Sequence, residues 1–173
     1  SKHDQPPFEG EKEQASPGHE SAMKHEPDFG ESSYRGHDRL KDRVALVTGA
    51  DSGIGRAVAL AFAREGADVA IAYLNEHDDA KETKRVVEAA GRKAITIASN
   101  LAPASTCERV VDEAVKAFGR IDVLVNNAAY QGKTLESIID LDDERLMHTF
   151  ETNILIRKHD RRAVFERQSG AGV

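Results

Sequence analysis

Two kinds of hydrophobic pattern alternate along residues 38–156. Short apolar runs, typical of strands buried on both faces of a parallel sheet, occur four times, and a longer amphipathic stretch follows each run. The expected strands cover residues 43–48, 68–73, 93–98 and 121–125. The expected helices cover residues 54–65, 78–90 and 104–118, and a fourth begins near residue 143. This order predicts an α/β fold: a doubly wound parallel sheet of about four strands with helices on both faces.

The spacing of apolar residues places particular side chains on one face of each helix. In the first helix these are Ile54, Val58, Ala61 and Phe62. In the third they are Cys107, Val110, Val111, Ala114 and Phe118. Cys107 is therefore expected in the core and not as a nucleophile. In the last helix the shared face carries Leu146, Phe150, Asn153 and Ile154. A buried amide must be hydrogen-bonded, so Asn153 needs a partner elsewhere in the fold.

Composition divides the chain into three parts. Residues 1–37 are rich in Pro, Gly, Glu, His and Ser and have almost no aliphatic side chains, so we expect a flexible arm, laid across the domain or a partner subunit. Residues 38–156 form the expected nucleotide-binding domain, and residues 157–173 form an atypical basic tail. The histidines of the arm, including His3, His19 and His25, are irregularly spaced and have no cysteine among them, so no metal site is predicted.

Charge and hydropathy exclude several classes of partner. The net charge of −6 and pI of about 5.7 argue against a nucleic-acid or anionic-membrane surface. No apolar run approaches the ~20 residues that span a bilayer, and no leader pattern opens the chain. The single cysteine fits a reducing compartment. We therefore expect a cytoplasmic protein that binds neither nucleic acid nor membrane.

A glycine-rich turn joins the first strand to the first helix. Gly49, Gly53 and Gly55 follow the strand directly, and such a turn lets backbone N–H groups and a helix N-terminus approach a phosphate. Asn100 and Asn126 follow two other strands. Because the carboxyl ends of parallel strands meet at one edge of the sheet, these residues are predicted to converge on a single ligand crevice.

Four motifs in this order resemble the short-chain dehydrogenase/reductase family. Residues 48–55, TGADSGIG, resemble its T-G-x-x-x-G-I-G signature, and residues 126–129, NNAA, resemble its N-N-A-G element with Ala129 in place of glycine. Asn100-Leu101 stands where the family has an Asp-Val/Leu pair that contacts adenine, and Asn153 matches the Asn of its Asn-Ser-Tyr-Lys tetrad. With the arm, the sequence is similar to a bacterial general-stress oxidoreductase subgroup that carries an N-terminal extension.

The resemblance covers residues 34–156 and implies that the chain forms the N-terminal portion of a Rossmann-type doubly wound parallel sheet. It also implies hydride transfer between a nicotinamide cofactor and a small carbonyl or alcohol substrate. The implied cofactor-binding residues are Gly49, Ser52, Gly53, Ile54, Gly55, Tyr73, Asn100, Leu101, Asn126 and Ala128. Ser52 stands where NADP-preferring members carry Arg or Lys, and Tyr73 stands where NAD-preferring members carry Asp, so the choice between NAD and NADP stays open. Members of the family form homo-oligomers, partly through the last helix.

The chain departs from the family after residue 156. No tyrosine follows Tyr130, so the catalytic Ser and the Tyr-x-x-x-Lys pair are absent and Asn153 is the one tetrad residue present. The switch to a basic segment indicates a changed reading frame or spliced end, or else a solvated helix end. We expect no turnover from this chain, and we expect residues 121–125 to form an exposed apolar sheet edge. The alternatives are a non-catalytic nucleotide-binding half-domain or partner module, and a gene fragment with no folded product.

Overall fold

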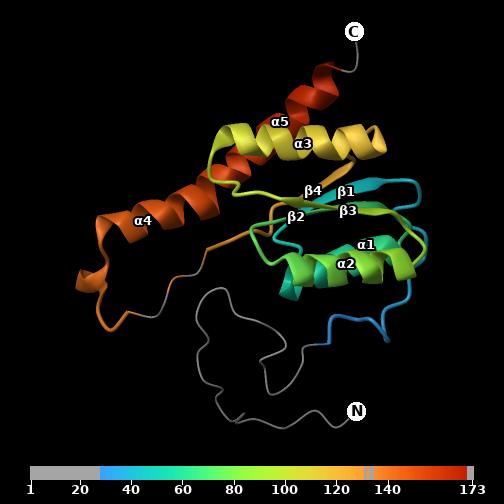
Figure 1. The fold of residues 1–173 in the computed structure, drawn as a ribbon, viewed down its shortest axis with the longest axis horizontal. Coiled ribbons are helices and arrows are strands. Elements are labelled where there is room, and N and C mark those ends of the chain that lie inside the picture. Colours follow the sequence, from blue (N-terminus) through green and yellow to red (C-terminus); the bar gives the residue numbers. More distant parts are fainter. Residues whose placement is uncertain (1–27, 131, 133–134, 171–173) are drawn as a thin grey trace.

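A computed structural model describes residues 28–130, 132 and 135–170. Its four strands are β1 (Val44–Thr48), β2 (Asp68–Tyr73), β3 (Ala94–Ala98) and β4 (Val123–Val125). They form one parallel sheet in the order β3-β2-β1-β4. Helices α1 (Gly53–Arg64) and α2 (His77–Ala89) cover one face, and α3 (Ala104–Phe118) and α5 (Ile156–Gly170) cover the other (Figure 1). The predicted Rossmann-type α/β architecture is confirmed, and β1 marks the point where strand order reverses.

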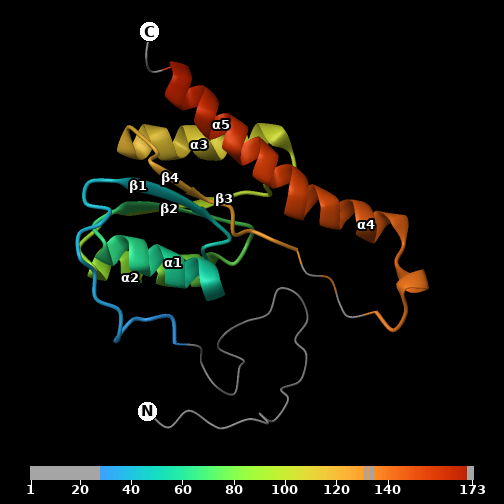
Figure 2. The same ribbon diagram turned by 180° about the vertical axis from the view of Figure 1, so that it is seen from behind.

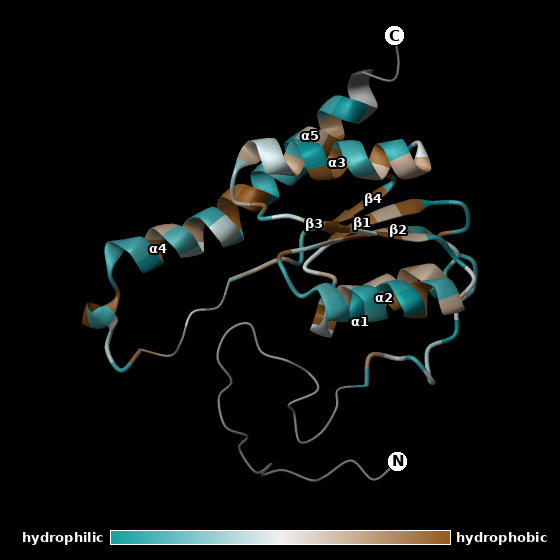
Figure 3. Ribbon diagram, in the orientation of Figure 1, coloured by the Kyte–Doolittle hydropathy of each residue, from teal (hydrophilic) through white to brown (hydrophobic). Residues whose placement is uncertain are grey.

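Strand β1 holds the centre of the sheet and is buried along its whole length. Its side chains alternate between two cores, as the period of a strand requires. Ala45 and Val47 face α1 and α2, whereas Leu46 faces α3 and α5. The strands are accordingly the most hydrophobic part of the layered structure (Figure 3).

Strand β4 is shorter than the predicted 121–125. Asp122 turns its carboxylate to the start of β1, where Oδ2 accepts the Val44 N–H at 2.9 Å, while Ile121 stays buried. Among the strands of the described residues, β4 pairs with β1 alone, so its outer edge is open, as the sequence predicts.

Helix α3 buries the face that its sequence predicts, whereas helix α1 does so only in part. In α3 the buried residues are Cys107, Val110, Val111 and Ala114. In α1 they are Gly55, Arg56, Ala59, Leu60 and Ala63, and Ile54 is 77% exposed. The periodicity placed Val58 and Phe62 correctly beside the core, where both are partly buried, but it ignored Gly55, whose backbone packs against the preceding turn. That contact sets the rotation of the helix, so Ala59 and Ala63, at four-residue steps, face the sheet.

The last helix is continuous but changes its winding. A short 3₁₀ turn (Ile138–Asp140) precedes α4 (Asp143–Phe150), which Asp142 caps by accepting the Arg145 N–H at 2.7 Å. A π-helical segment, η3 (Glu151–Leu155), then joins α4 to α5. No residue of α4 is buried, and the helix projects away from the sheet (Figures 1 and 2). Its predicted apolar face is therefore exposed in this chain, with Phe150 and Ile154 more than half accessible.

Residues 157–170, which composition assigned to a basic tail, form α5 together with Ile156. Ala163 and Val164 are buried against α3, while the arginines at 157, 161 and 162 are exposed. No helix among the described residues has the length and apolar content to cross a bilayer.

Residues 28–42, which we term the N-terminal segment, lie along α1. The Glu65 carboxylate accepts the N–H groups of His37 and Arg39 at 2.9 and 3.0 Å, and the Tyr34 hydroxyl donates to its other oxygen at 2.5 Å. These hydrogen bonds, led by that of Tyr34, lower the pKa of Glu65 to about 2. The packed domain therefore includes residues 28–37, which composition assigned to the arm; residues 1–27, with His3, His19 and His25, lie outside the described residues.

A carboxylate is buried where α5 packs on α3. Asp160 is fully buried, and neither of its carboxylate oxygens has a hydrogen-bond partner within the described parts of the chain. The neighbouring Cys107 thiol donates to the Leu101 carbonyl at 3.2 Å, and the core position predicted for this cysteine is confirmed. Burial raises the pKa of Asp160 and raises that of Cys107 to about 12.

Asp160→Asn is expected to raise the melting temperature by a few degrees at pH 8, because burying an unpaired carboxylate costs about 1–3 kcal/mol. The folded carboxyl keeps its proton to higher pH than the unfolded one, so its contribution to stability falls as pH rises above the ordinary value of 3.8. The gap between variant and wild type should therefore shrink at pH 4. Thermal unfolding at both pH values, with the exposed Glu136→Gln as control, measures it; a gap independent of pH contradicts the prediction.

Candidate functional site

The turn between β1 and α1 requires glycine at defined positions. A Cβ on Gly55 would lie 2.0 Å from the Gly49 carbonyl oxygen and 2.7 Å from the Ala50 Cα. Gly49 and Gly53 have φ angles of +61° and +52°, a region that other residues rarely adopt. The turn therefore brings backbone against backbone and leaves the start of α1 at the carboxyl end of the sheet.

The first turn of α1 holds no acidic residue, although the carboxylate of Asp51, just before the N-cap, accepts the Ser52 hydroxyl at 3.3 Å. Ser52 occupies the N-cap position, but its side chain makes no capping hydrogen bond. The partial positive charge of a helix start, together with N–H groups that have no carbonyl one turn earlier, suits an anion such as a phosphate.

The side chains of Thr48 and Asn127 join the glycine turn to the residues after β4 by hydrogen bonds. The Thr48 hydroxyl accepts the N–H groups of Asn127 and Ala128, both at 3.1 Å. The Asn127 amide donates to the carbonyls of Thr48 and Gly49 at 3.1 and 2.8 Å. The sequence-based site omitted Asn127 and the role of Thr48. The Asn-Asn pair was the available signal, but nothing local shows which asparagine bonds the turn.

A cavity of about 270 Å³ opens at this edge of the sheet. Of the residues proposed from sequence, those that line it are Gly49, Tyr73, Asn100, Leu101 and Ala128. Ser52, Gly53, Ile54 and Gly55 form the adjoining turn and the start of α1, and Asn126 follows β4 directly. The structure thus brings the strand-end motifs together around one space.

Two buried polar atoms at this edge have no hydrogen-bond partner among the residues that the structure describes. Within residues 28–130, 132 and 135–170, neither the Ser99 hydroxyl nor the Asn126 Oδ1 has a hydrogen-bond partner. Ser99 also lines the cavity. Buried polar groups are normally satisfied, so a polar ligand in the cavity is a suitable source for the missing bonds. The residues present therefore fit a polar occupant such as a dinucleotide.

Two further lining residues already make local hydrogen bonds. The Asn100 side-chain oxygen accepts the Ala102 N–H at 3.0 Å, which uses one of its two lone pairs. The Tyr73 hydroxyl lies 2.8 Å from His77 Nδ1. Both side chains are therefore held in place at the cavity before any ligand binds.

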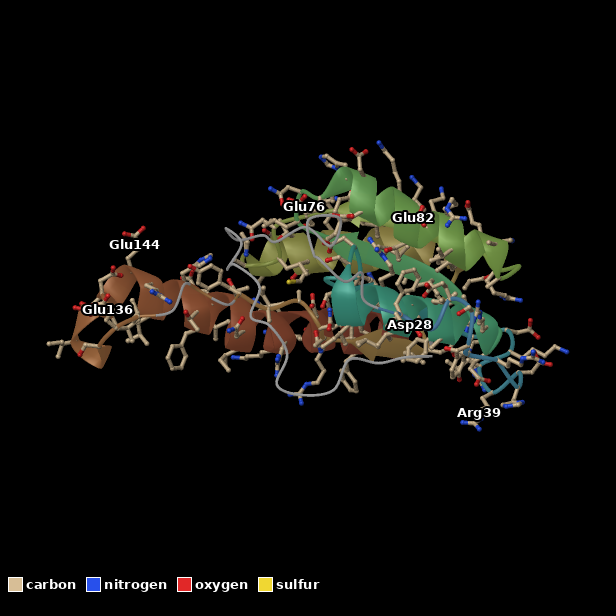
Figure 4. The ribbon with its side chains drawn as sticks, turned by 90° about the horizontal axis from the view of Figure 1, so that it is seen from below. Asp28, Arg39, Glu76, Glu82, Glu136 and Glu144 are labelled. Atoms are coloured by element: carbon tan, nitrogen blue, oxygen red, sulfur yellow. The ribbon has the colours of Figure 1, made fainter. Side chains whose placement is uncertain are left out.

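The cavity is acidic beside the end of β2. Asp51 and Glu76 both line it, and Figure 4 shows Glu76 at the start of α2. Burial raises the pKa of Asp51, and the carboxylates of Asp79 and Glu76 add to the shift. In the part of the chain that the structure describes, no three His, Cys, Asp or Glu side chains are grouped to hold a metal ion.

The Asn153 side chain, on an otherwise apolar helix face, is hydrogen-bonded to the backbone of Tyr130. Its Oδ1 accepts the Tyr130 N–H at 2.7 Å, and its Nδ2 donates to the Tyr130 carbonyl at 2.9 Å. It lies in the π-helical segment, a feature common at functional sites. The Tyr130 ring packs edge-on against His148, 4.4 Å between centroids, and both residues line the cavity. Asn153 thus fixes the backbone that forms this wall of the cavity.

Comparison with known proteins gives consistent matches. Residues 43–165 match the family model described as short chain dehydrogenase. The chain is 50% identical over 137 residues to general stress protein 39 of Bacillus subtilis, which covers 79% of this chain and 48% of that protein. It is 47% identical over 154 residues to NADPH-dependent aldehyde reductase 1, chloroplastic, of Arabidopsis thaliana, which covers 84% of this chain and 52% of that protein. The chain spans about half the length of these relatives.

Solved structures of short-chain dehydrogenases share the fold of this chain. A short chain dehydrogenase from Burkholderia cenocepacia in complex with NADP superposes with a TM-score of 0.70 at 36% identity, over 74% of this chain and 51% of that one. An NAD⁺-bound xylitol dehydrogenase superposes with a TM-score of 0.69 at 30% identity, over 73% of this chain and 48% of that one.

Gly55→Ala is expected to destabilise the fold by about 2–4 kcal/mol, because its methyl group would meet backbone atoms that have no room to move. Gly91→Ala is the control: unlike Gly55, Gly91 has a positive φ, of +83°, which strains any side chain, but a Cβ there meets nothing within 4 Å. The control should cost only about 1 kcal/mol. Urea unfolding measures both, and equal costs would show that the close approach at Gly55 is not required.

Proposed function

Because the chain belongs to the short-chain dehydrogenase family, we propose that its cavity binds a nicotinamide dinucleotide, NAD or NADP. The whole protein would use it for hydride transfer to or from a small carbonyl or alcohol. The observation that supports this most directly is the glycine turn, which presents the start of α1 to a cavity at the reversal point of the sheet. We assign the binding unit to residues 38–156.

Different residues of the chain would bind different parts of the dinucleotide. The pyrophosphate would lie on the backbone of the glycine turn and on the first turn of α1, at Gly49, Ser52, Gly53, Ile54 and Gly55. Tyr73, Asn100 and Leu101 would contact the adenosine half. Asn126 and Ala128, at the end of β4, would complete the site. When bound, the nicotinamide would supply or accept the hydride.

Asn153 would act on the site through Tyr130. By holding both backbone groups of Tyr130, it keeps the segment after β4 against the last helix and so shapes the cavity. None of the three tyrosines, at positions 34, 73 and 130, is followed by lysine four residues later. We therefore propose that this 173-residue polypeptide binds the dinucleotide without turning over a carbonyl or alcohol.

Titration of the pure chain with NADH and with NADPH, followed by cofactor fluorescence, tests the proposal. Ala129→Phe should weaken binding more than about tenfold, because Ala129 lines the cavity yet is exposed, so the larger ring fills space meant for ligand without disturbing the core. Ala117→Phe, on the exposed face of α3, is the control and should leave both binding and melting temperature unchanged. If the wild-type chain binds neither cofactor, the proposed binding is wrong. If it reduces a carbonyl, the proposed lack of turnover is wrong.

A second candidate is a nucleotide-binding module that works with a partner, and the exposed apolar face of α4 and of the π-helical segment after it favours this candidate. Met147, Phe150 and Ile154 are 56, 52 and 54% exposed. Side chains of this size gathered on one helix are typical of a surface that another subunit covers.

Sedimentation velocity on the pure chain tests this second candidate. A discrete dimer that Phe150→Glu converts to monomer is expected, because the charge would have to be desolvated in the contact. The exposed Glu144→Gln serves as control. A wild-type chain that sediments as a monomer at all concentrations contradicts the idea.

A further inference from the structure

Arg56 is a buried arginine whose guanidinium donates a hydrogen bond to the backbone of the glycine turn. The residue is 5% exposed. Its Nη2 donates to the Asp51 carbonyl at 2.7 Å, and its Nε donates to the Thr83 hydroxyl at 3.0 Å. The Thr83 hydroxyl in turn donates to the same Asp51 carbonyl at 2.8 Å. One carbonyl of the turn is thereby held by two donors, one from α1 and one from α2.

The same guanidinium also reaches the first turn of α2. Its Nη2 lies 3.3 Å from Asp79 Oδ1. Since Asp51 lines the cavity, this network joins the cavity wall to both helices on that face of the sheet. Charge-assisted hydrogen bonds with little exposure to water are strong and directional, so the network fixes the shape of the turn.

The N-terminal segment covers this guanidinium. The Phe29 ring centroid lies 5.5 Å from the guanidinium carbon of Arg56. Eight residues further along the same helix, Arg64 donates to the carbonyls of Gly30, at 2.6 Å, and of Tyr34. The segment therefore runs along α1 from Arg56 to Glu65; Figure 4 shows Asp28 over this helix and Arg39 near its C-terminal end.

We propose that the N-terminal segment positions the glycine turn for the dinucleotide, with Phe29 acting through Arg56. The ring face attracts the cation and keeps water from it, which restricts the guanidinium to the orientation that holds the Asp51 carbonyl. Phe29, Arg56 and Thr83 are positioning residues in this account, since none of them lines the cavity. The inference rests on the proposed function for its effect on cofactor binding, but its effect on the turn is independent of any ligand.

Phe29→Ala in the full chain tests the proposal with two measurements. Hydrogen exchange of the ligand-free protein should show the amides of residues 49–54 exchanging about three- to tenfold faster, because the guanidinium loses its cover. NADH should bind about three- to tenfold more weakly. Phe29→Tyr, which keeps the ring face, should restore both values. Tyr34→Phe, which loses only the bond to Glu65 at the other end of the segment, should speed exchange at residues 36–42 and leave the turn unchanged.

Equal exchange at residues 49–54 in Phe29→Ala, Tyr34→Phe and wild type overturns the proposal. So does faster exchange in Phe29→Ala that Phe29→Tyr fails to restore, since the ring face would then have no specific role. Failure of the wild-type chain to bind NADH or NADPH overturns the proposed function instead, and the ligand-free exchange comparison then decides the positioning role by itself.

Discussion

The close approach of backbone at Gly49 and Gly55 is the constraint on which the rest of the site depends. A Cβ on Gly49 would come within 2.9 Å of the Ala128 Cα, and one on Gly55 within 2.0 Å of the Gly49 carbonyl oxygen. Three segments therefore meet with backbone close to backbone: the end of β1, the start of α1 and the turn after β4. This contact fixes the rotation of α1 and leaves the helix N-terminus open toward the cavity.

Hydrogen bonds from distant residues keep that contact closed. Thr48 and Asn127 join the two strand ends, and Arg56 and Thr83 hold the opposite side of the turn. Each partner is buried or half-buried, so the bonds compete little with water. The turn is thus held from two sides before a ligand arrives, which lowers the ordering cost of binding.

Two carboxylates show that the N-terminal segment and α5 are held against the rest of the fold by different interactions. Glu65 receives three donors from the N-terminal segment, and the pKa of its carboxyl falls to about 2. Asp160, on the buried face of α5, has no hydrogen-bond partner among the described residues, and burial raises its pKa. The N-terminal segment is therefore bound by satisfied polar contacts, whereas α5 is held by apolar burial at Ile156, Ala163 and Val164 and by an exposed ion pair of Arg167 with Asp112, against the cost of burying the Asp160 carboxylate. The exposed apolar residues of α4 and the open edge of β4 belong to the same half of the structure, in a chain that spans about half the length of its relatives.

The sequence by itself determined the type and order of the strands and helices, because hydrophobic period and glycine positions are local properties. It also placed Gly49, Asn100 and Asn126 at one edge, since carboxyl ends of parallel strands share an edge, and it showed that Asn153 needs a partner. Tertiary structure alone decided the rotation of α1, the identity of that partner as Tyr130, and the docking of residues 28–42. Each of these depends on groups far apart in the chain: Asn127 and Gly49 are separated by 78 positions, and Tyr34 and Glu65 by 31. Periodicity records which residues avoid water, but it carries no information about which distant backbone atom will fill the space beside them.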